Sequence, residues 1–511
     1  MNKYVLANPL SVLLDKPKEE FTRDDLLKII EMKELERITF HYTALDGKLK
    51  ELKIPLPSRR DAEIILTEGE RVDGSSLFKG MVDPGISDLY IVPIYKSAFI
   101  NPFDSGSLDF VCRYLSRDGY LAPFTPDNIL LKAYELFKKD TGMEILALGE
   151  LEFYLFWNYN TPLYMMPPQG GYQASSPWYK AGKVLSEILK NITQITSAVK
   201  YVHSEVGFIK CIESGYEEIN GKTGEQCEVE LLPTPIDETA DNIVLAKWLI
   251  RNIAFQNGML ATFAPKLEDG YAGNGMHVHV RITKDGKNAL VDSSGVLTET
   301  AKRLIGGLCH YANTLTAFGN TVTSSYMRLV PDQEAPTKVC WSDSNRSVLI
   351  RVPLGWAAVH NLAKVVNPES AFTPFEHENM QTIELRTPDG SANAHLLLAG
   401  ITMAADWGLT NDRALQIANE LYVKGNITDN PELLKKLPSL SKTCYESAEM
   451  LNSKRNHYER ENVFLPSVID YIIDMLKSQN DKDLHKKLAD LFGRNKTKEI
   501  KYLLHKDLHK H

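Results

Sequence analysis

The segment from Gly275 to Ile282, GMHVHVRI, alternates polar and apolar residues, and this alternation favours a β-strand. Side chains of a strand repeat with a period of two, so His277 and His279 project from one face while Val278 and Val280 project from the other. A solvated face of an antiparallel sheet shows the same pattern. The pair therefore leaves two alternatives, an exposed sheet face and a site that uses imidazoles.

Three further segments place polar residues two positions apart in an apolar setting. In LGELEFYLF, Glu150 and Glu152 share one strand face while Leu151 takes the other. The same pairing joins Glu228 with Glu230 in QCEVELL and Glu384 with Arg386 in QTIELRTP. Each pair alone fits an exposed face, but strands of one domain could direct all of these side chains into one cavity.

Such a cavity would suit divalent cations. Glutamate and histidine without thiolate are ligands for Mg²⁺ or Mn²⁺ rather than for structural zinc. Carboxylates that face one another without a cation repel and raise one another's pKa. A pair of cations removes this repulsion and neutralises phosphate oxygens.

Three arginines, Arg328, Arg346 and Arg351, lie close together in a stretch of otherwise apolar or small residues. The guanidinium fork matches carboxylate and phosphate groups, so the cluster favours a site that binds both. Three structural ion pairs are the alternative. The segment from Gly215 to Thr223 resembles a phosphate-binding P-loop, but it has one residue too many between its glycines and no preceding apolar strand, which favours a surface turn.

Composition narrows the class of protein. The chain has 511 residues, enough for several domains, and its net charge of -8 argues against a nucleic-acid partner. No apolar run reaches the about 18 residues of a membrane span, and the N-terminus has no signal-peptide pattern. Six cysteines without a C-x-x-C pair predict a reducing, cytoplasmic location.

The chain divides into four predicted parts. An N-terminal extension at 1–21 precedes a β-rich domain at 22–123, where a capping box opens a helix that runs to Met32 and two strands flank Asp46-Gly47. Helices and strands alternate through 124–480. The tail at 481–511 is rich in Lys and His and predicts a basic amphipathic helix, which is solvated or packs on a subunit rather than binding nucleic acid or membrane.

Ten motifs in order along the chain identify a resemblance to the glutamine synthetase family, most nearly its bacterial and archaeal type I branch. The resemblance extends from about Asp24 to about Leu409. The motifs are VDGSS at 72–76, GELEF at 149–153, GGY at 170–172, HSEV at 203–206, QCEVE at 226–230, ATFAPK at 261–266, GNGMHVH at 273–279, RLVPDQEAP at 328–336, NRSVLIR at 345–351 and IELRTPDGSAN at 383–393.

The resemblance implies an α+β fold, with a β-grasp-like N-terminal domain and a catalytic domain built on a curved antiparallel sheet flanked by helices. It also implies a homo-oligomer, a dodecamer of two stacked hexameric rings, with active sites between neighbouring subunits. The substrates would be ATP, L-glutamate and ammonium. Two or more Mg²⁺ or Mn²⁺ ions would serve each site.

Matched position by position, the resemblance implies a role for each motif residue. One cation would be held by Glu152, Glu205 and Glu228, and the other by Glu150, His277 and Glu384. Glutamate would contact Arg328, Arg386 and the Gly273 backbone, and the nucleotide and transferring phosphoryl group would contact His279, Arg346 and Arg351. Ammonium would be bound by Asp73 of the adjacent subunit, Tyr172 and Glu205. Ser76 belongs to the substrate side, Glu334 to the loop that closes the site, and the catalytic residues would be Asp73, Glu334 and Arg346.

Three departures from the family pattern fall near these residues. Ala272 stands where the family has an asparagine that grips the amino acid, and Asn274 is a candidate to replace it. Ser344 replaces an arginine, which weakens the expected phosphate or nucleotide contact. An insertion at about 207–225 is expected beside the mouth of the active site.

Three functions follow from these observations. Retained metal ligands, Asp73 and Tyr172 favour a glutamate-ammonia ligase that acts through γ-glutamyl phosphate. Ala272 and the insertion favour a related ligase that joins glutamate to a larger amine, such as a polyamine or ethanolamine. A non-catalytic structural relative is the third alternative, against which the six metal ligands argue.

Overall fold

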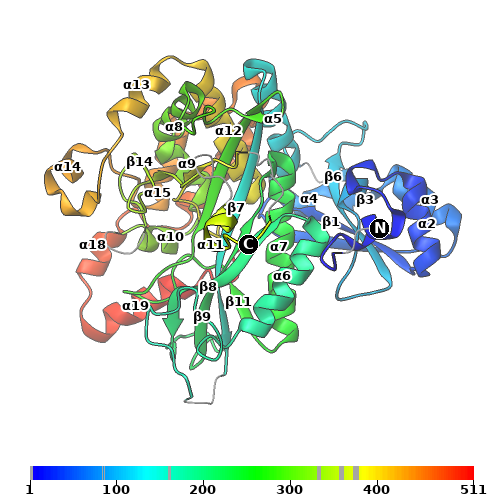
Figure 1. Ribbon diagram of the computed structural model, residues 1–511, viewed down its shortest axis with the longest axis horizontal. Coiled ribbons are helices and arrows are strands. Elements are labelled where there is room, and N and C mark those ends of the chain that lie inside the picture. The colour runs from blue at the N-terminus through cyan, green and yellow to red at the C-terminus, as the bar shows by residue number, and fades with distance from the viewer. Residues whose placement is uncertain are drawn as a thin grey trace.

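The computed structural model describes residues 4–82, 85, 87–158, 163–330, 335–355, 362–371 and 379–510 (Figure 1). A smaller N-terminal part, blue to cyan in Figure 1, lies beside a larger body that carries the rest of the chain. Each part has its own sheet and its own apolar core. The arrangement is the α+β fold that the sequence predicts.

The N-terminal sheet is mixed, with strand order β2-β1-β6-β4-β3. Its parallel central pair, β1 and β6, is the arrangement expected of a β-grasp-like domain, and Phe40 and Phe110 from this pair are fully buried. The capping box at Thr22 opens α2 as predicted, because its side chain accepts from the Asp25 N–H. The elements of this part are α1 (Pro9–Leu14), η1 (Lys18–Glu20), α2 (Arg23–Lys33), β1 (Arg37–Thr43), β2 (Leu49–Pro55), α3 (Arg59–Glu68), β3 (Glu70–Asp73), α4 (Gly74–Leu77), β4 (Asp88–Pro93), η3 (Tyr95–Ser97), β5 (Phe99–Ile100) and β6 (Ser107–Leu115).

The larger sheet has the order β14-β15-β16-β12-β7-β9-β8, and all of its pairs are antiparallel except β14 with β15. The predicted strands that carry polar pairs, β7, β9, β12 and β16, are therefore neighbours. The strands are β7 (Glu144–Trp157), β8 (Val199–Ile209), β9 (Thr223–Leu231), β10 (Thr234–Pro235), β11 (Leu260–Thr262), β12 (Met276–Lys284), β13 (Lys287–Asn288), β14 (Trp341–Asp343), β15 (Ile350–Val352) and β16 (Ile383–Leu385).

One face of this sheet is covered by helices. Leu151, Phe153 and Leu155 of β7 are completely buried on that face, and α7 packs against the strand (Figure 1). Because strand side chains alternate, Glu150 and Glu152 point to the other face. The helices near this face are α5 (Pro126–Thr141), α6 (Gly182–Thr196), α7 (Ile236–Gln256) and α12 (Ala394–Thr410).

A buried ion-pair network joins the two parts. Arg113 of β6 donates to Asp241 of α7 at 2.8 Å, and His395 of α12 contacts the same carboxylate at 3.0 Å. The N-terminal extension also packs on the body, since Lys18 pairs with Glu238 of α7 at 2.7 Å. The parts are thus held together through α7, which also backs β7 of the larger sheet.

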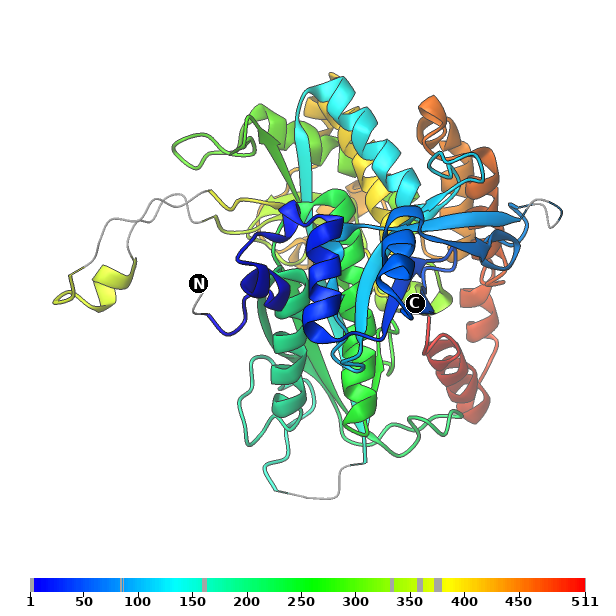
Figure 2. The same ribbon diagram turned by 90° about the vertical axis from the view of Figure 1, so that its right-hand side faces the viewer.

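The remaining helices complete the body. Figure 2 shows α11 projecting away from the rest of the molecule. No helix among the described residues is long and apolar enough to cross a membrane. The helices are α8 (Glu299–His310), α9 (Ala312–Gly319), α10 (Thr323–Arg328), α11 (Leu362–Val366), α13 (Arg413–Glu420), η4 (Ile427–Asp429), α14 (Pro431–Lys436), α15 (Cys444–Ser453), α16 (Arg455–Tyr458), η5 (Arg460–Asn462), α17 (Pro466–Lys477), α18 (Leu484–Ala489) and α19 (Gly493–His505).

Candidate active site

A cavity of about 640 Å³ lies on the face of the larger sheet opposite α7. It brings together most of the residues that the sequence singles out. Its lining includes Glu150, Glu152, Tyr172, Glu205, Glu228, Gly273, His277, His279, Arg328, Arg346, Arg351, Glu384 and Arg386. The polar pairs of the neighbouring strands therefore line one cavity rather than an exposed face of the sheet.

Two predicted residues lie elsewhere, and a third is outside the described residues. Asp73 and Ser76 lie in the N-terminal part and are not among the described residues that line the cavity. Asp73 caps α4, where its carboxylate accepts from the Ser75 N–H at 2.9 Å and the Ser76 hydroxyl at 2.6 Å. These hydrogen bonds lower the pKa of Asp73 to about 2. Glu334 lies outside the described residues.

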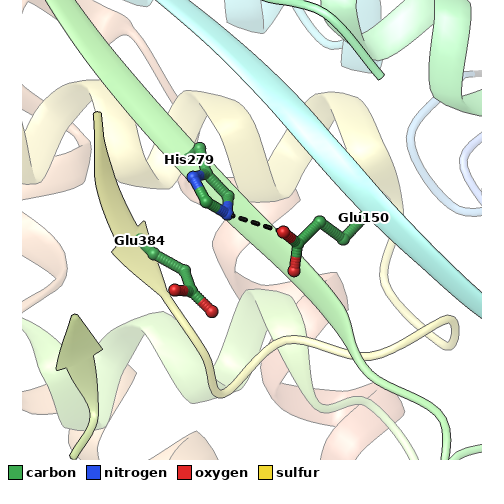
Figure 3. A group of neighbouring side chains, drawn as sticks. All are labelled: Glu150, His279 and Glu384. Carbon is green, nitrogen blue, oxygen red and sulfur yellow. Dashed lines mark hydrogen bonds and ion pairs between the residues drawn. The ribbon is translucent and has the colours of Figure 1, made fainter. Parts of the chain in front are cut away.

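Glu150 joins both histidines of the opening motif. Its two carboxylate oxygens lie 2.9 Å from His277 Nδ1 and 3.0 Å from His279 Nε2, and His279 Nδ1 contacts the Thr382 hydroxyl at 2.8 Å. Figure 3 shows Glu150, His279 and Glu384 converging from three neighbouring strands. Burial disfavours the charged imidazole of His279, but the Glu150 carboxylate more than compensates and raises the pKa of His279.

Two arginines hold Glu384. Arg351 lies 2.8 Å from one carboxylate oxygen and Arg386 lies 3.0 Å from the other. His277 Nδ1 also approaches Glu384 at 3.5 Å. Because the side chain of Glu384 is only 2% exposed, its charge depends on these partners.

Glu228 occupies the most acidic part of the cavity. Burial raises its pKa well above the usual value, and the neighbouring carboxylates of Glu150, Glu152 and Glu205 raise it further. Its nearest basic partner is His203, whose Nε2 lies 2.9 Å away. A cation at this position would relieve the repulsion that otherwise favours the protonated acid.

The donor set fits divalent cations. Three groups have ligand atoms that all lie within 4.8 Å of one another. These groups are Glu150 with His279 and Glu384, Glu150 with Glu228 and His277, and His203 with Glu205 and Glu228. These groups differ from the two predicted ligand sets. Glu150 and Glu228, which were predicted in separate sets, occur in one group, and Glu152 occurs in none of the three. The Glu152 carboxylate instead accepts from the Gly275 N–H at 2.6 Å.

Mg²⁺ or Mn²⁺ is expected to raise the melting temperature. Binding to the folded protein at about 100 times Kd stabilises it by about 2.7 kcal/mol, provided that the unfolded chain does not bind. Thermal denaturation in EDTA and in millimolar Mg²⁺ measures the shift, and Ca²⁺ reports on selectivity. Equal melting temperatures in EDTA and in Mg²⁺ or Mn²⁺ would contradict a cation site.

Gly273 and Arg328 form another part of the cavity wall. An added Cβ at Gly273 would lie 2.3 Å from the Pro265 carbonyl and 3.1 Å from Arg328 Cγ, so only glycine allows this close approach. The Arg328 guanidinium donates to the Thr387 carbonyl at 2.9 Å and to the Arg386 carbonyl at 3.3 Å. These bonds fix one side of the guanidinium at the cavity wall.

Asn274 does not take over the contact missing at Ala272. It is completely buried, its amide donates to the Ala264 carbonyl at 2.9 Å, and its side-chain oxygen accepts from Gln226 at 3.1 Å. The Asn274 side chain therefore points into the protein, and Ala272 lines the cavity wall without a side-chain amide.

Unlike Ala272, the other two departures are not part of the described cavity lining. Ser344 occupies a turn with φ 53°, and its N–H bonds to the Val352 carbonyl at 2.8 Å. The insertion at 207–225 extends the β8–β9 hairpin and contributes no described residue to the cavity lining, contrary to its expected place at the mouth. The candidate P-loop within it contains turns and no helix, as predicted for a surface turn.

Sequence reasoning gave no role to Lys200, Tyr201 and His203, which also line the cavity. A register shift between Val199 and Tyr201 places two residues of β8 opposite Glu230. Such a bulge re-aims side chains, and Lys200 lies 2.7 Å from the buried Glu230 carboxylate. His203 and Glu205 are themselves a pair two positions apart, which is the signal that could have revealed His203.

A buried cavity lined by carboxylates, imidazoles and arginines is typical of enzymes that hold divalent cations beside phosphate- or carboxylate-bearing substrates. Comparison with known proteins narrows the class. A family model described as the glutamine synthetase catalytic domain matches residues 124–491. The chain therefore belongs to the glutamine synthetase family, whose members are ATP- and metal-dependent ligases that form carbon–nitrogen bonds.

Relatives agree with this assignment. The chain is 30% identical to glutamine synthetase of Methylococcus capsulatus over 483 residues, which cover 89% of this chain and 95% of that protein. It is 31% identical to glutamine synthetase of Pyrococcus horikoshii over 403 residues, or 78% of this chain and 79% of that protein. The branch within the family stays a prediction.

Solved structures confirm the fold. A cryo-EM structure of Plasmodium falciparum glutamine synthetase aligns with a TM-score of 0.70 at 20% identity, over 91% of this chain and 97% of that one. A GmaS/ADP complex aligns with the same TM-score at 18% identity, over 93% and 99%.

Proposed function

We propose that the protein is a glutamate-ammonia ligase that consumes ATP and passes through γ-glutamyl phosphate. The observation that carries the proposal is the cavity in which a cluster of carboxylates and imidazoles adjoins Arg328, Arg346, Arg351 and Arg386. Carboxylate, phosphate and cation can be held in such a cavity together. The proposed parts of the chain are an N-terminal extension at 1–21, a β-grasp-like domain at 22–123, a catalytic domain at 124–480 and a C-terminal tail at 481–511.

The carboxylate and imidazole residues would hold the cations. We retain the two predicted sets, Glu152 with Glu205 and Glu228, and Glu150 with His277 and Glu384. Mg²⁺ or Mn²⁺ bound there would neutralise phosphate oxygens and polarise the transferred group. His203, which approaches Glu228, joins the candidates for the first set.

The arginines would divide between the two reacting molecules. Arg328, Arg386 and the Gly273 backbone would orient the glutamate carboxylates. Arg346, Arg351 and His279 would face the phosphates of ATP and stabilise the charge on the transferring group. A free carboxylate has a poor leaving group, whereas γ-glutamyl phosphate releases inorganic phosphate when an amine attacks.

Ammonium would enter on the side of Tyr172 and Glu205. The Tyr172 ring lies edge-on to His203, with ring centroids 5.6 Å apart, at this end of the cavity. Asp73 of an adjacent subunit would take the proton from ammonium, with Ser76 holding its carboxylate. Glu334 would help to exclude water, which would otherwise hydrolyse the intermediate.

This assignment requires a homo-oligomer, because Asp73 lies outside the cavity of its own chain. The form proposed is a dodecamer of two stacked hexameric rings in the cytoplasm. All six cysteines are free thiols, which suits a reducing compartment.

A larger amine is the second candidate substrate. It is favoured by the departure at Ala272, where no side-chain amide lines the cavity, because the substrate side differs there from the family pattern. The product would then be a γ-glutamyl amide of a polyamine or ethanolamine.

Product identification tests both candidates. Purified protein is incubated with ATP, Mg²⁺ and L-glutamate, together with ammonium or a panel of amines, and products are identified by mass spectrometry. We expect glutamine and phosphate with ammonium, both abolished by Glu150→Ala. A γ-glutamyl amide formed only with a larger amine would establish the second candidate, and no ATP turnover with any amine would favour the non-catalytic relative.

A further inference from the structure

We propose that the C-terminal segment, residues 493–510, positions the loop that forms the acid-binding wall of the cavity, and that His505 is the positioning residue. The wall loop is defined as residues 262–275, which include Ala272 and Gly273. The inference deepens the proposed function, because it assigns a residue that acts on the binding of the acid substrate.

His505 connects the wall loop with the insertion. Its Nε2 lies 2.8 Å from the Leu267 carbonyl, and its Nδ1 lies 2.9 Å from the Ser214 hydroxyl. A carbonyl oxygen only accepts, so Nε2 carries the proton and donates to Leu267. Nδ1 then accepts from Ser214, and the ring is a neutral bridge between two segments.

The environment of His505 supports a neutral, fixed ring. The residue is 1% exposed, and burial lowers its pKa. A side chain with both nitrogens bonded and almost no access to water has a single favoured orientation. Its contact with Leu267 is therefore a defined constraint on the wall loop.

Leu508 fixes the beginning of the same loop. The Thr262 hydroxyl donates to the Leu508 carbonyl at 2.6 Å. The Leu508 side chain is 2% exposed and packs in a small apolar cluster with Phe156, Ile219 and Leu267. The C-terminal segment is therefore hydrogen-bonded to the wall loop at two points, Thr262 and Leu267.

The larger sheet is hydrogen-bonded to the wall loop through residues of β7 and β9. The Tyr154 hydroxyl donates to the Ala272 carbonyl at 3.2 Å, and the Gln226 amide donates to the Gly273 carbonyl at 3.0 Å. Lys266 spans the loop by donating to the Tyr271 carbonyl. The wall loop thus lies between β7 and β9 on one side and the C-terminal segment on the other.

This arrangement predicts an effect confined to one substrate. Gly273 approaches Arg328, and both line the end of the cavity assigned to the acid. Of the residues assigned to ATP, His279 lies on β12, Arg351 on β15 and Arg346 in the turn before β15, so none belongs to the wall loop. Loosening the loop should therefore weaken acid binding more than ATP binding.

The test compares three variants of the full-length protein. His505→Ala removes the bridge, and His505→Gln retains a donor that can reach the Leu267 carbonyl. Lys501→Met is the matched control on the same helix, because it removes an ion pair of 2.8 Å with the exposed Glu213 and a charge attraction to Glu268 but leaves the His505 bridge in place. The KM for the acid, the KM for ATP, kcat and melting temperature are measured for each.

We expect His505→Ala to raise the KM for glutamate by about tenfold, as for a lost buried hydrogen bond, and the KM for ATP by less than about twofold. His505→Gln should restore most of the glutamate KM, and Lys501→Met should match the wild type. A fall in melting temperature with both KM values unchanged would reduce His505 to a structural role and overturn the proposal.

Hydrogen exchange separates this inference from the proposed function. His505→Ala should accelerate amide exchange in residues 262–275 relative to Lys501→Met, whichever amine the enzyme uses. Unchanged exchange there would overturn the inference even if the wild type makes glutamine. Absence of glutamine from the wild type, together with faster exchange in the variant, would instead reject the proposed substrates and retain the positioning of the loop.

Discussion

Glu150→Gln is expected to lower kcat by about 100- to 1,000-fold, the range for loss of a principal electrostatic group in an active site. Glu150 is the residue that both His277 and His279 contact, and it belongs to two of the three ligand groups. Glutamine keeps the shape and one oxygen but removes the charge that a cation needs. The measurement is steady-state turnover of ATP at saturating substrates, together with the Mg²⁺ dependence of the rate.

Glu144→Gln is the matched control, because Glu144 starts the same strand and lies at the surface, 3.4 Å from Lys138. It should leave kcat unchanged, since an exposed pair contributes little. Circular dichroism confirms that both variants are folded. A Glu150→Gln enzyme with a wild-type rate and wild-type Mg²⁺ dependence would remove Glu150 from the metal site.

Arg328→Met is expected to raise the KM for glutamate by about 10- to 100-fold, the cost of a lost charge-assisted hydrogen bond. Arg328 is 4% exposed, and its guanidinium is aimed at the cavity by the carbonyls of Arg386 and Thr387. Methionine fills a similar volume but supplies no donor. The melting temperature should also fall, because the two carbonyls lose their partner.

The diagnostic readout is the difference between the two substrates. The KM for ATP should change far less than the KM for glutamate, because an interaction lost only with the acid changes only its binding. Arg303→Met, which removes a surface arginine paired with Glu299 at 2.7 Å, should change neither value. Equal increases for ATP and glutamate would mean that Arg328 supports the whole cavity rather than the acid.

The local periodicity of the sequence was sufficient to predict the strands and the strand face of most candidate ligands. The alternation around Glu150, Glu228 and His277 predicts which strand face each side chain takes, because that face depends only on the period of two. The helix opened by the capping box at Thr22 and the hairpin around Asp46-Gly47 were also predicted correctly. These features depend on neighbours within a few residues.

The grouping of the side chains could not be derived in this way. Glu150 meets His277 because β7 pairs with β12, and it lies opposite Glu230 because β7 also pairs with β9. Lys200 reaches the cavity only because a register shift in β8 re-aims it. The Asn274 side chain turns inward because it bonds to Gln226, which lies on β9, and to the carbonyl of Ala264, at the other end of the wall loop.

The sequence by itself determined the family, the strand faces and the set of charged residues available for cations and phosphate. Only the tertiary structure decided that His203 joins the acidic cluster, that the insertion packs beside the C-terminal segment, and that His505 reaches the wall loop. The physical reason is that side-chain periodicity is a local property of the chain. Contacts between residues 238 positions apart, as for His505 and Leu267, form only when the packing of the whole chain brings them together.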